Sequence, residues 1–353
     1  MKKLFHVLLA LCLLFGLSAS AQPAVVEITD AAGLAAIAAN PAGSYALAND
    51  IDMRGVPWTP LPFRGQLDGR GHTLYNLRIT NLGPDQAKTI DGNHKRYDTA
   101  FAALFGVAED ATISNLHLLG VDVLIEDADN CFGAGIAGYA ENTQITGCSV
   151  TGRIHVMQKG KMGGVGGLVG FGSGLIADSS ADVELVFAST TPRIRCEQFL
   201  GGLIAVGYPD ILRNSVKLSG FASVRGYAHN GGLIGMYHYH PKHGGKHQGY
   251  VQDNQVDATI RFFEQGGDRR AYSKPFLGEK LHKTVEVTGN QEIRFESKES
   301  KNYKQILLPQ TCEDPLYATA ITSPTQDLWG YTTYSCTTCS YTYRGDYVRP
   351  LGQ

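Results

Sequence analysis

The sequence predicts an all-β protein whose body is a right-handed parallel β-helix with a short N-terminal capping helix. Three observations predict this fold: a high glycine content, short apolar runs rich in Ile and Val, and phrases that recur at a regular spacing. Glycine makes up 42 of 353 residues, against a usual share of about 7%, while 43% of the chain is hydrophobic. Tight turns between many buried strands account for both values.

The first recurring phrase is an apolar segment flanked by glycine or alanine, and a second phrase that begins with Ile or Val follows it. The first phrase occupies residues 103–106, 135–138, 167–170, 202–205 and 232–235, at spacings of 32, 32, 35 and 30. The second occupies residues 113–116, 145–148, 176–179, 211–214 and 251–254. Each period therefore contains two or three short strands, which we expect to stack on the equivalent strands of the next period.

Glycine permits the tight turn at each corner of such a coil. The Asn and Asp residues of the second phrase suit turn positions, where they can stack in ladders. A β-propeller is the second interpretation, but a blade usually needs four strands and a period of about 40 residues or more. A β-sandwich, the third, would not repeat. At the N-terminus, Thr29 or Asp30 can cap a helix over residues 31–39.

The first 21 residues have the three parts of a secretory signal peptide. Lys2 and Lys3 precede the apolar run 4–17, and small residues at 18–21 suit cleavage before Gln22. We therefore expect an exported protein at the cell surface, in the periplasm or outside the cell. No other run approaches the roughly 18 apolar residues of a spanning helix, so we expect no membrane span in the mature chain. The net charge of −2 argues against a nucleic-acid partner.

Residues 63–77 read Phe-x-Gly-x-Leu-Asp-Gly-x-Gly-His-Thr-Leu-x-Asn-Leu. They follow Leu-x-x-Asp-Ile-Asp at 47–52 and precede Leu-Phe-Gly at 104–106 and Ile-x-Asn-Leu at 113–116. With these motifs in this order, residues 27–262 resemble the secreted bacterial β-helix proteins that carry GLUG-type repeats. The resemblance implies that this segment is a structural coil of the solenoid. Members of this group occur in large surface proteins, including adhesin-like ones. The resemblance therefore implies the fold and the location of the chain more than its activity.

These signals divide the chain into four parts. After the signal peptide at 1–21, residues 22–262 are expected to form the β-helix with its N-terminal cap. Residues 263–310 are charged with mixed signs, and we expect irregular coil or edge strands that cover the open end of the solenoid. Residues 311–353 are expected to form a Cys-containing β-hairpin tail, which resembles the short Cys-x-x-Cys modules appended to bacterial surface proteins.

Six cysteines remain once the signal peptide has left, an even number that permits disulfides in an exported chain. Cys131 with Cys148 is one pair that is near in sequence, and Cys336 with Cys339 or Cys312 is another. A zinc site needs four ligands, and Cys312, Cys336 and Cys339 supply three. A disulfide is therefore favoured in the tail, and zinc remains the alternative.

The densest polar cluster in the chain is residues 237–250. Its four closely spaced histidines are His238, His240, His243 and His247. Neutral imidazoles suit a divalent Zn, Cu or Ni ion, although no carboxylate or Cys pattern fixes a geometry here. The other candidate role is ligand contact, in which tyrosine rings stack on sugars. The candidate ligand-contacting residues are Tyr237, Tyr239, His240, His243 and Tyr250. A solvated, glycine-rich loop is the plain alternative, and no pattern in the chain requires a cofactor.

We expect a non-enzymatic, adhesin-like protein that binds a glycan or a host or matrix protein along a solenoid face. Insertions in repeat proteins tend to map to the binding face, which favours the loop at 237–250. The alternative is a polysaccharide-degrading enzyme, a lyase before a glycoside hydrolase. Candidate hydrolase carboxylates are Asp50, Asp52 and Asp68, and candidate lyase residues are Arg193, Arg195, Lys242 and His243. An enzyme should show convergent Lys, Arg, His or paired carboxylates in a groove, whereas a binder should show exposed aromatic rings.

Overall fold

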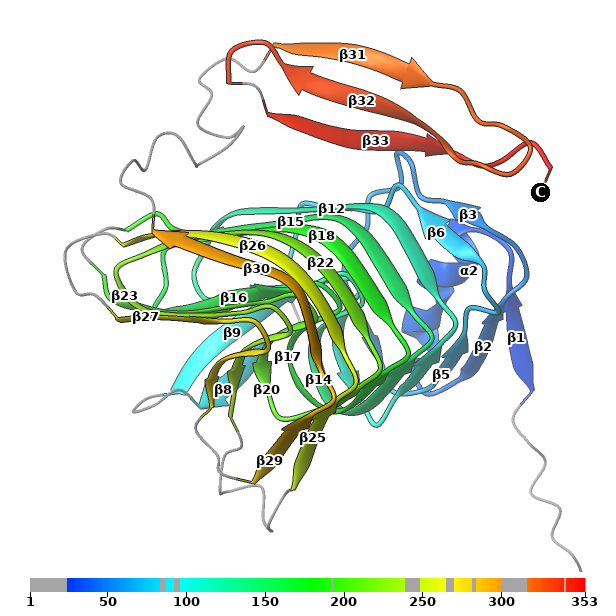
Figure 1. Cartoon of the computed structure of the whole chain (residues 1–353). Coiled ribbons are helices and arrows are strands. Elements are labelled where there is room, and N and C mark those ends of the chain that lie inside the picture. Colours follow the sequence, from blue (N-terminus) through cyan, green and yellow to red (C-terminus); the bar gives the residue numbers. More distant parts are fainter. Residues whose placement is uncertain are drawn as a thin grey trace, which may run out of the picture.

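The chain folds into a parallel β-helix, as a computed structural model shows (Figure 1). The structure describes residues 24–82, 87–91, 96–191, 194–238, 248–264, 270–280, 284–299, 316–339 and 341–352. Three long sheets run side by side along the solenoid, and a small antiparallel sheet formed by the C-terminal residues lies against it. The predicted all-β solenoid fold is therefore confirmed.

The N-terminal cap is strand β1 (Val25–Ile28) followed by helix α2 (Ala31–Ala35) and a 3-10 turn η1 (Ala36–Ala39). The Asp30 side chain accepts a hydrogen bond from the backbone N–H of Gly33 at 2.8 Å, which satisfies one of the free donors at the helix start. Leu34 and Ile37 are completely buried against the first coil. The predicted capping helix over residues 31–39 is confirmed.

Sheet 1 has fourteen strands, all paired in parallel. Its strands are β1, β2 (Ser44–Leu47), β4 (Leu61–Phe63), β5 (Gln66–Asp68), β10 (Phe105–Glu109), β11 (Thr112–Ser114), β14 (Ala137–Thr146), β17 (Val169–Ala177), β20 (Ile204–Gly207), β21 (Asp210–Leu212), β24 (Ile234–Tyr237), β25 (Gly249–Gln252), β28 (Leu277–Lys280) and β29 (Val285–Thr288). Each coil contributes one long strand or two short ones, so the sheet runs from the N-terminal cap to the last coil.

Sheet 2 has nine parallel strands and sheet 3 has seven strands. Sheet 2 consists of β3 (Ile51–Asp52), β6 (Thr73–Tyr75), β7 (Arg78–Ile79), β12 (His117–Ala128), β15 (Ser149–Gln158), β18 (Ser180–Ser189), β22 (Ser215–Val224), β26 (Gln255–Glu264) and β30 (Gln291–Glu299). Sheet 3 consists of β8 (Lys88–Asp91), β9 (Arg96–Ala102), β13 (Cys131–Gly133), β16 (Met162–Gly166), β19 (Cys196–Gly201), β23 (Gly226–Gly231) and β27 (Arg270–Lys274). Strands β8 and β9 pair with each other in antiparallel fashion and form a hairpin.

The first recurring phrase forms the corner between sheet 3 and sheet 1. Its central aliphatic residues stack one above another and are completely buried; they are Leu104, Ile136, Leu168, Leu203 and Leu233. Glycine recurs beside them because the chain turns back closely on itself. A Cβ atom at Gly201 would lie 1.9 Å from the carbonyl oxygen of Ile204, a distance that only glycine avoids.

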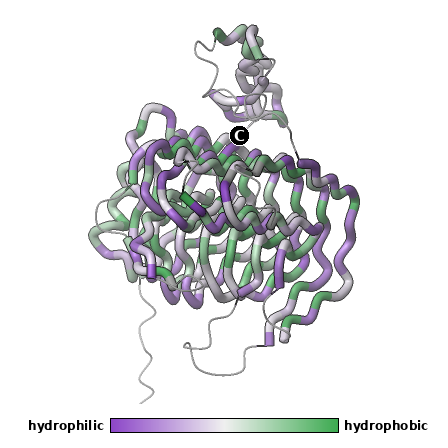
Figure 2. The backbone as a smooth tube through the Cα atoms, turned by 90° about the vertical axis from the view of Figure 1, so that its left-hand side faces the viewer, coloured by the Kyte–Doolittle hydropathy of each residue, from purple (hydrophilic) through white to green (hydrophobic). Residues whose placement is uncertain are grey.

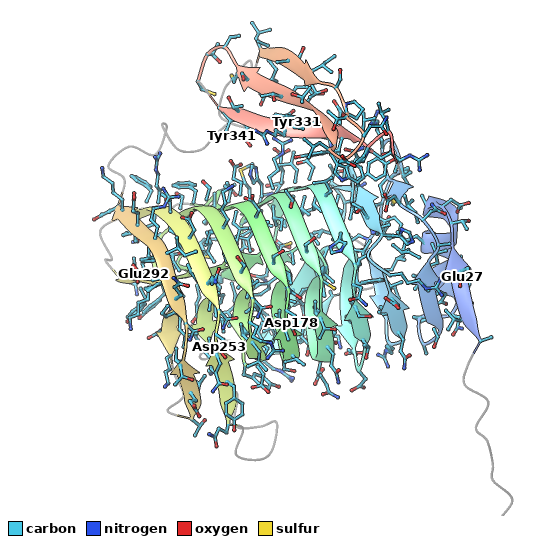
Figure 3. All side chains as sticks on the ribbon, turned by 45° about the vertical axis from the view of Figure 1, so that its right-hand side comes forward. Glu27, Asp178, Asp253, Glu292, Tyr331 and Tyr341 are labelled. Atoms are coloured by element: carbon cyan, nitrogen blue, oxygen red, sulfur yellow. The ribbon has the colours of Figure 1, made fainter. Side chains whose placement is uncertain are left out.

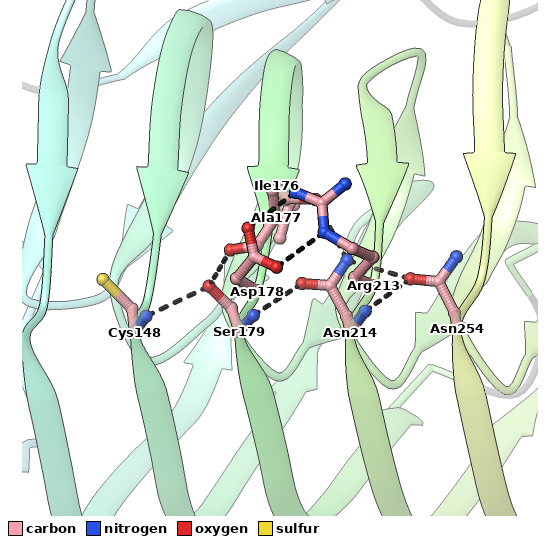
Figure 4. A network of polar contacts seen from close by, with 8 residues as sticks. All are labelled: Cys148, Ile176, Ala177, Asp178, Ser179, Arg213, Asn214 and Asn254. Atoms are coloured by element: carbon pink, nitrogen blue, oxygen red, sulfur yellow. Dashed lines mark hydrogen bonds and ion pairs between the residues drawn. The ribbon is translucent and has the colours of Figure 1, made fainter.

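The second recurring phrase forms the corner between sheet 1 and sheet 2. Asn115, Asp178, Arg213 and Asp253 all have a φ between 50° and 57° at this corner, in the left-handed region. Asn and Asp tolerate that region better than most residues, which explains their recurrence after Ile or Val. After Asp178, Arg213 and Asp253, the next residue of the coil points inward, and these residues, Ser179, Asn214 and Asn254, form a polar ladder (Figure 4). Figure 2 shows the stacked coils, along which hydrophilic and hydrophobic residues interchange.

The β-helix continues beyond residue 262, the end predicted from the sequence. Strands β27 to β30 add a further coil, and β30 pairs in parallel with β26. Strand β30 is exposed along almost its whole length, because it has a neighbouring strand on one side only. The strand therefore needs no row of apolar side chains, and its charged sequence shows little of the alternation by which strands are recognised.

The C-terminal residues form a three-stranded antiparallel sheet rather than a two-stranded hairpin. It consists of β31 (Tyr317–Thr322), β32 (Gly330–Cys336) and β33 (Thr342–Val348), in that order. The sheet lies along the outer side of sheet 2 (Figures 1 and 3). Strand β33 provides most of the contact, and the backbone of Tyr347 and the side chain of Asn76 exchange hydrogen bonds of 2.7 and 3.0 Å.

Three cysteines of the solenoid, Cys131, Cys148 and Cys196, are free thiols in its interior. The sequence-near pair Cys131 and Cys148 is therefore not a disulfide in this structure. Burial raises the pKa of Cys131 and of Cys196 to about 12, and that of Cys148 to about 11. These thiols act as small apolar core residues.

Candidate functional site

The loop region predicted to bind a ligand is described only at its two ends. Tyr237 lies in the core with 1% of its surface exposed, and its hydroxyl donates to the carbonyl oxygen of Tyr208 at 3.3 Å. Its ring cannot stack on a sugar, which corrects the prediction for this residue: strand β24 turns this ring toward the interior. Tyr250 is half-buried on β25. Tyr239, His240, His243 and His247 lie outside the described residues.

His238 is half-buried, and its backbone N–H donates to the carbonyl oxygen of Gly207 at 2.9 Å. Among the residues that the structure describes, no three His, Cys, Asp or Glu side chains come together in a way that could hold a metal ion. No helix in that part of the chain is long and apolar enough to cross a membrane.

Cys336 is buried at the end of β32, and its Sγ lies 3.0 Å from the Oγ1 of Thr338. The hydrogen bond with Thr338, followed by further bonds in the same turn, lowers the pKa of Cys336 to about 6. Cys339 is exposed in this turn, and Cys312 lies outside the described residues.

The candidate carboxylates of the N-terminal coils hold turns together. Asp50 accepts a hydrogen bond from the backbone N–H of Thr73, and Asp52 and Asp68 accept from the N–H groups two residues further along the chain. They occupy turn positions of the type expected for Asp. Arg195 lies just before β19, whereas Arg193, Lys242 and His243 lie outside the described residues.

A cleft lies between the C-terminal sheet and sheet 2. It contains two adjacent cavities of about 600 and 650 Å³, within the usual range for small-molecule sites. Both cavities are lined by Arg153, Tyr343 and Arg344. We treat this cleft as the candidate functional site, because it is large, concave and lined by convergent polar and aromatic groups.

Arg153 forms the boundary between the two cavities. It projects from β15, where its Nε and Nη2 donate to the two carboxylate oxygens of Asp122 at 2.8 and 3.2 Å. Its guanidinium carbon lies 3.7 Å from the ring centre of Tyr343 on β33, and its Nη1 lies 3.4 Å from the Tyr341 hydroxyl. One side chain of sheet 2 thus holds two rings of the C-terminal sheet in place.

Glu184 on β18 provides a second attachment point. Its carboxylate accepts hydrogen bonds from the Tyr341 hydroxyl at 2.8 Å and from the Nε2 of His155 at 2.6 Å. Burial alone would raise the pKa of Glu184, but the hydrogen bonds from His155 and Tyr341 and the charge of Arg153 lower it overall. Glu184 therefore remains ionised in the interface. Figure 3 shows Tyr341 on the side of the C-terminal sheet that faces the solenoid.

The lining of the cleft includes more cations than carboxylates. The charged residues that line the first cavity are Arg54, Arg78, Arg153, Arg344, Asp122 and Asp346. Those of the second are Arg153, Lys217, Arg294, Arg344, Asp182 and Glu184. Each lining thus has four cations and two carboxylates, with Arg153 and Arg344 common to both. Two of the other cations pair with carboxylates outside the lining, Arg54 with Asp52 and Arg294 with Asp257. Arg344 is exposed, and its guanidinium lies 4.4 Å from the ring centre of Tyr331.

The tyrosine hydroxyls near the cleft are poor proton acceptors. Burial raises the pKa of Tyr341, and the hydrogen bond with Asp346 raises that of Tyr334 to about 12. No motif in the sequence indicates this cleft. Its one local signal is the alternation at the start of β33, where Tyr343 and Tyr341, the residue just before the strand, both face Arg153. This alternation could not reveal which sheet the two rings would face.

No family model matches this chain, and no curated protein sequence matches it.

Proposed function

We propose that the chain is an exported, surface-associated, non-enzymatic protein that binds an acidic glycan in the cleft between the C-terminal sheet and sheet 2. The observation that carries the proposal is the exposed guanidinium of Arg344 beside tyrosine rings, in a cleft lined by further arginines. The N-terminal segment 1–21 supports export to the cell surface, the periplasm or the medium. The resemblance of residues 27–262 to GLUG-type repeat proteins supports an adhesin-like role.

The chemistry of the cleft favours carboxylate- or sulfate-bearing sugars. A guanidinium group presents a planar fork of donors that fits such anions in a bidentate manner. Arg344 is exposed at the boundary between the two cavities, and Tyr343 lies beside it. The two cavities together extend along several coils, which suits an extended chain of sugars. Host or matrix proteins that carry acidic glycans are therefore the proposed partners.

A polysaccharide lyase is the second candidate, because arginine can neutralise a uronate carboxylate and the cleft contains several arginines. Such a reaction also needs a base to remove a proton from the sugar. The raised pKa values of Tyr334 and Tyr341 leave these hydroxyls protonated near neutral pH. We therefore rank elimination second, since a protonated hydroxyl is a poor base.

A binding experiment with defined acidic glycans tests the proposal. The chain is applied to an array of uronate-containing, sulfated and neutral glycans, and the absorbance of unsaturated products is followed in parallel with acidic polysaccharides. We expect binding to acidic glycans that falls at least about tenfold in Arg344→Ala and is unchanged in Lys159→Ala. Lys159 is an exposed cation that does not line the cleft.

Two outcomes would contradict the proposal. Equal binding by Arg344→Ala and the parent chain would place the ligand elsewhere. Formation of unsaturated product would establish the lyase instead, and its loss in Arg344→Ala would place that activity in the cleft.

A further inference from the structure

A second, smaller hollow lies on the outer face of sheet 1, away from the C-terminal sheet. It has a volume of about 140 Å³ and lies between the β8–β9 hairpin, strands β14 and β17, and Tyr208, which follows β20. None of its lining residues lines the cleft. His238, one of the residues predicted from the sequence, contributes to its wall.

Aromatic rings form one wall of this hollow. Tyr139 and Phe171 occupy paired positions on β14 and β17, and their rings are stacked with centres 5.7 Å apart and planes within 3°. Phe132 of sheet 3 packs edge-on against Phe171 with ring centres 5.8 Å apart. The wall is therefore rigid and apolar, and Phe171 remains half-exposed toward the hollow.

Glycine leaves the floor open. Gly172 lines the hollow, and a Cβ atom there would lie 2.4 Å from the carbonyl oxygen of Ala140 on the coil below. Gly207, the paired residue on the next coil, has a φ of +153°, and its Cβ would lie 1.8 Å from the carbonyl oxygen of Gly172. Neither position accepts a side chain, so no side chain at these two positions fills the space above the strands.

Polar groups surround the aromatic wall without an excess of either charge. The Tyr139 hydroxyl donates to Glu141 at 2.9 Å, and Glu141 lines the hollow together with Arg96. They are its one carboxylate and its one arginine. The Lys88 ammonium lies 4.7 Å from the ring centre of Tyr139 and forms an ion pair with Glu109. The lining thus offers donors, acceptors and an apolar surface to a neutral ligand.

We propose that this hollow is a second binding site, which holds one ring of a neutral sugar. A cavity of about 150 Å³ can hold a benzene molecule, so a volume of 140 Å³ can take the six-membered ring itself, with the hydroxyl groups of the sugar at the polar rim. A pyranose presents apolar C–H groups to Phe171 and Tyr139 and hydroxyls to Glu141 and Arg96. This site is independent of the proposed cleft, because it differs from the cleft in location and in charge.

The test uses methyl glycosides of glucose, galactose, mannose and N-acetylglucosamine with the full chain, and saturation-transfer NMR as the readout. Two variants address the hollow. Phe171→Ala removes half of the aromatic wall, and Thr89→Trp places a bulky ring at its exposed rim. The control is Arg344→Ala, which changes the cleft alone. We expect at least one glycoside to bind with millimolar affinity, about tenfold more weakly in both variants and unchanged in the control.

Three results would overturn this second site: no glycoside binds the folded chain, binding persists in both variants, or binding is lost in Arg344→Ala. The last result would place the neutral sugar in the cleft. Acidic-glycan binding by Phe171→Ala is measured in the same samples. It reports on the cleft separately, so failure of one site is distinguishable from failure of the other.

Discussion

Asn214 and Asn254 occupy equivalent positions on successive coils, and the carboxamide oxygen of Asn254 accepts two hydrogen bonds from Asn214. The backbone N–H of Asn214 donates at 2.8 Å and its side-chain nitrogen at 3.0 Å (Figure 4). The same side-chain nitrogen also donates to the carbonyl oxygen of Ile176 at 3.0 Å. Ser179 precedes this ladder and Asn290 follows it. Each amide therefore satisfies backbone groups that the turn leaves without partners.

Replacement of Asn214 by Ala is expected to destabilise the solenoid. Asn214 and Asn254 are both buried. Asn214→Ala removes the side chain that pairs with the N–H of Ser179 and with the carbonyl of Ile176. Each buried group that loses its partner costs about 1–3 kcal/mol. For these two groups together, we expect the free energy of unfolding, measured by urea denaturation, to fall by roughly 2–6 kcal/mol. Gln144→Ala, at an exposed position, should change it by less than about 0.5 kcal/mol.

Asn214→Asp sharpens this test. The carboxylate keeps the acceptor for Ser179 but loses the donor to Ile176 and Asn254, and it places a charge in the interior. We expect it to be at least as destabilising as Asn214→Ala near neutral pH. A stability equal to that of the parent chain would show that the ladder does not contribute to folding.

The left-handed corner at Asn115 yields a separate prediction. Its φ is 50°, its backbone N–H donates to the carbonyl of Thr146, and the equivalent residue of the next coil is Gly147. Asn115→Val places a β-branched residue in this region at a cost of about 1–2 kcal/mol, whereas Asn115→Gly removes the strain. Thermal unfolding should show a lower Tm for the Val variant and a Tm near that of the parent chain for the Gly variant. Equal Tm values for the two variants would contradict this account.

The repeats made the solenoid predictable, because a fixed period and short Ile-rich strands leave few other folds. The left-handed corners are visible in the sequence as Asn115 and Asp178, but Arg213 occupies an equivalent corner and carries no such signal. The inward orientation of the Tyr237 side chain could not be predicted either, because it depends on how the coil closes rather than on the neighbouring residues in the sequence. The cleft could not be predicted, because Arg153 and Tyr343 are 190 residues apart in sequence and meet only through the docking of a separate sheet.

Acid should release the C-terminal sheet from the solenoid. The pKa of Glu184 is lower in the folded chain than its usual value of about 4.3. The Glu184 carboxylate therefore stabilises docking of the C-terminal sheet fully at pH values above about 4.3. The contribution is lost as the pH falls through the folded pKa, because the protonated carboxyl is a weaker acceptor for the Tyr341 hydroxyl of the C-terminal sheet. Below about pH 4 we therefore expect weaker docking.

Tryptophan fluorescence can follow this release. Trp329 of the C-terminal residues packs edge-on against Tyr75 of the solenoid with ring centres 5.0 Å apart, while Trp58, the other tryptophan, is buried in the core. The emission of a Trp58→Phe variant should change as the pH falls. In Glu184→Gln, docking should already be weaker at neutral pH, and the change near pH 4 should be absent. Persistence of that change in Glu184→Gln would assign it to another group.

Arg153 separates docking of the C-terminal sheet from ligand binding in the cleft. Arg153→Met removes the two hydrogen bonds to Asp122 and the contact with Tyr343, and hydrogen bonds to charged groups contribute about 1.5–3 kcal/mol each. We expect faster hydrogen exchange in β33 and weaker binding of acidic glycans. Arg153→Lys keeps the charge but lacks the planar fork, so it should show an intermediate effect on exchange. Arg344→Ala should weaken glycan binding and leave exchange in β33 unchanged, because Arg344 is exposed. If Arg344→Ala accelerates exchange as much as Arg153→Met does, docking and binding are not separable, and the loss of binding would reflect release of the sheet.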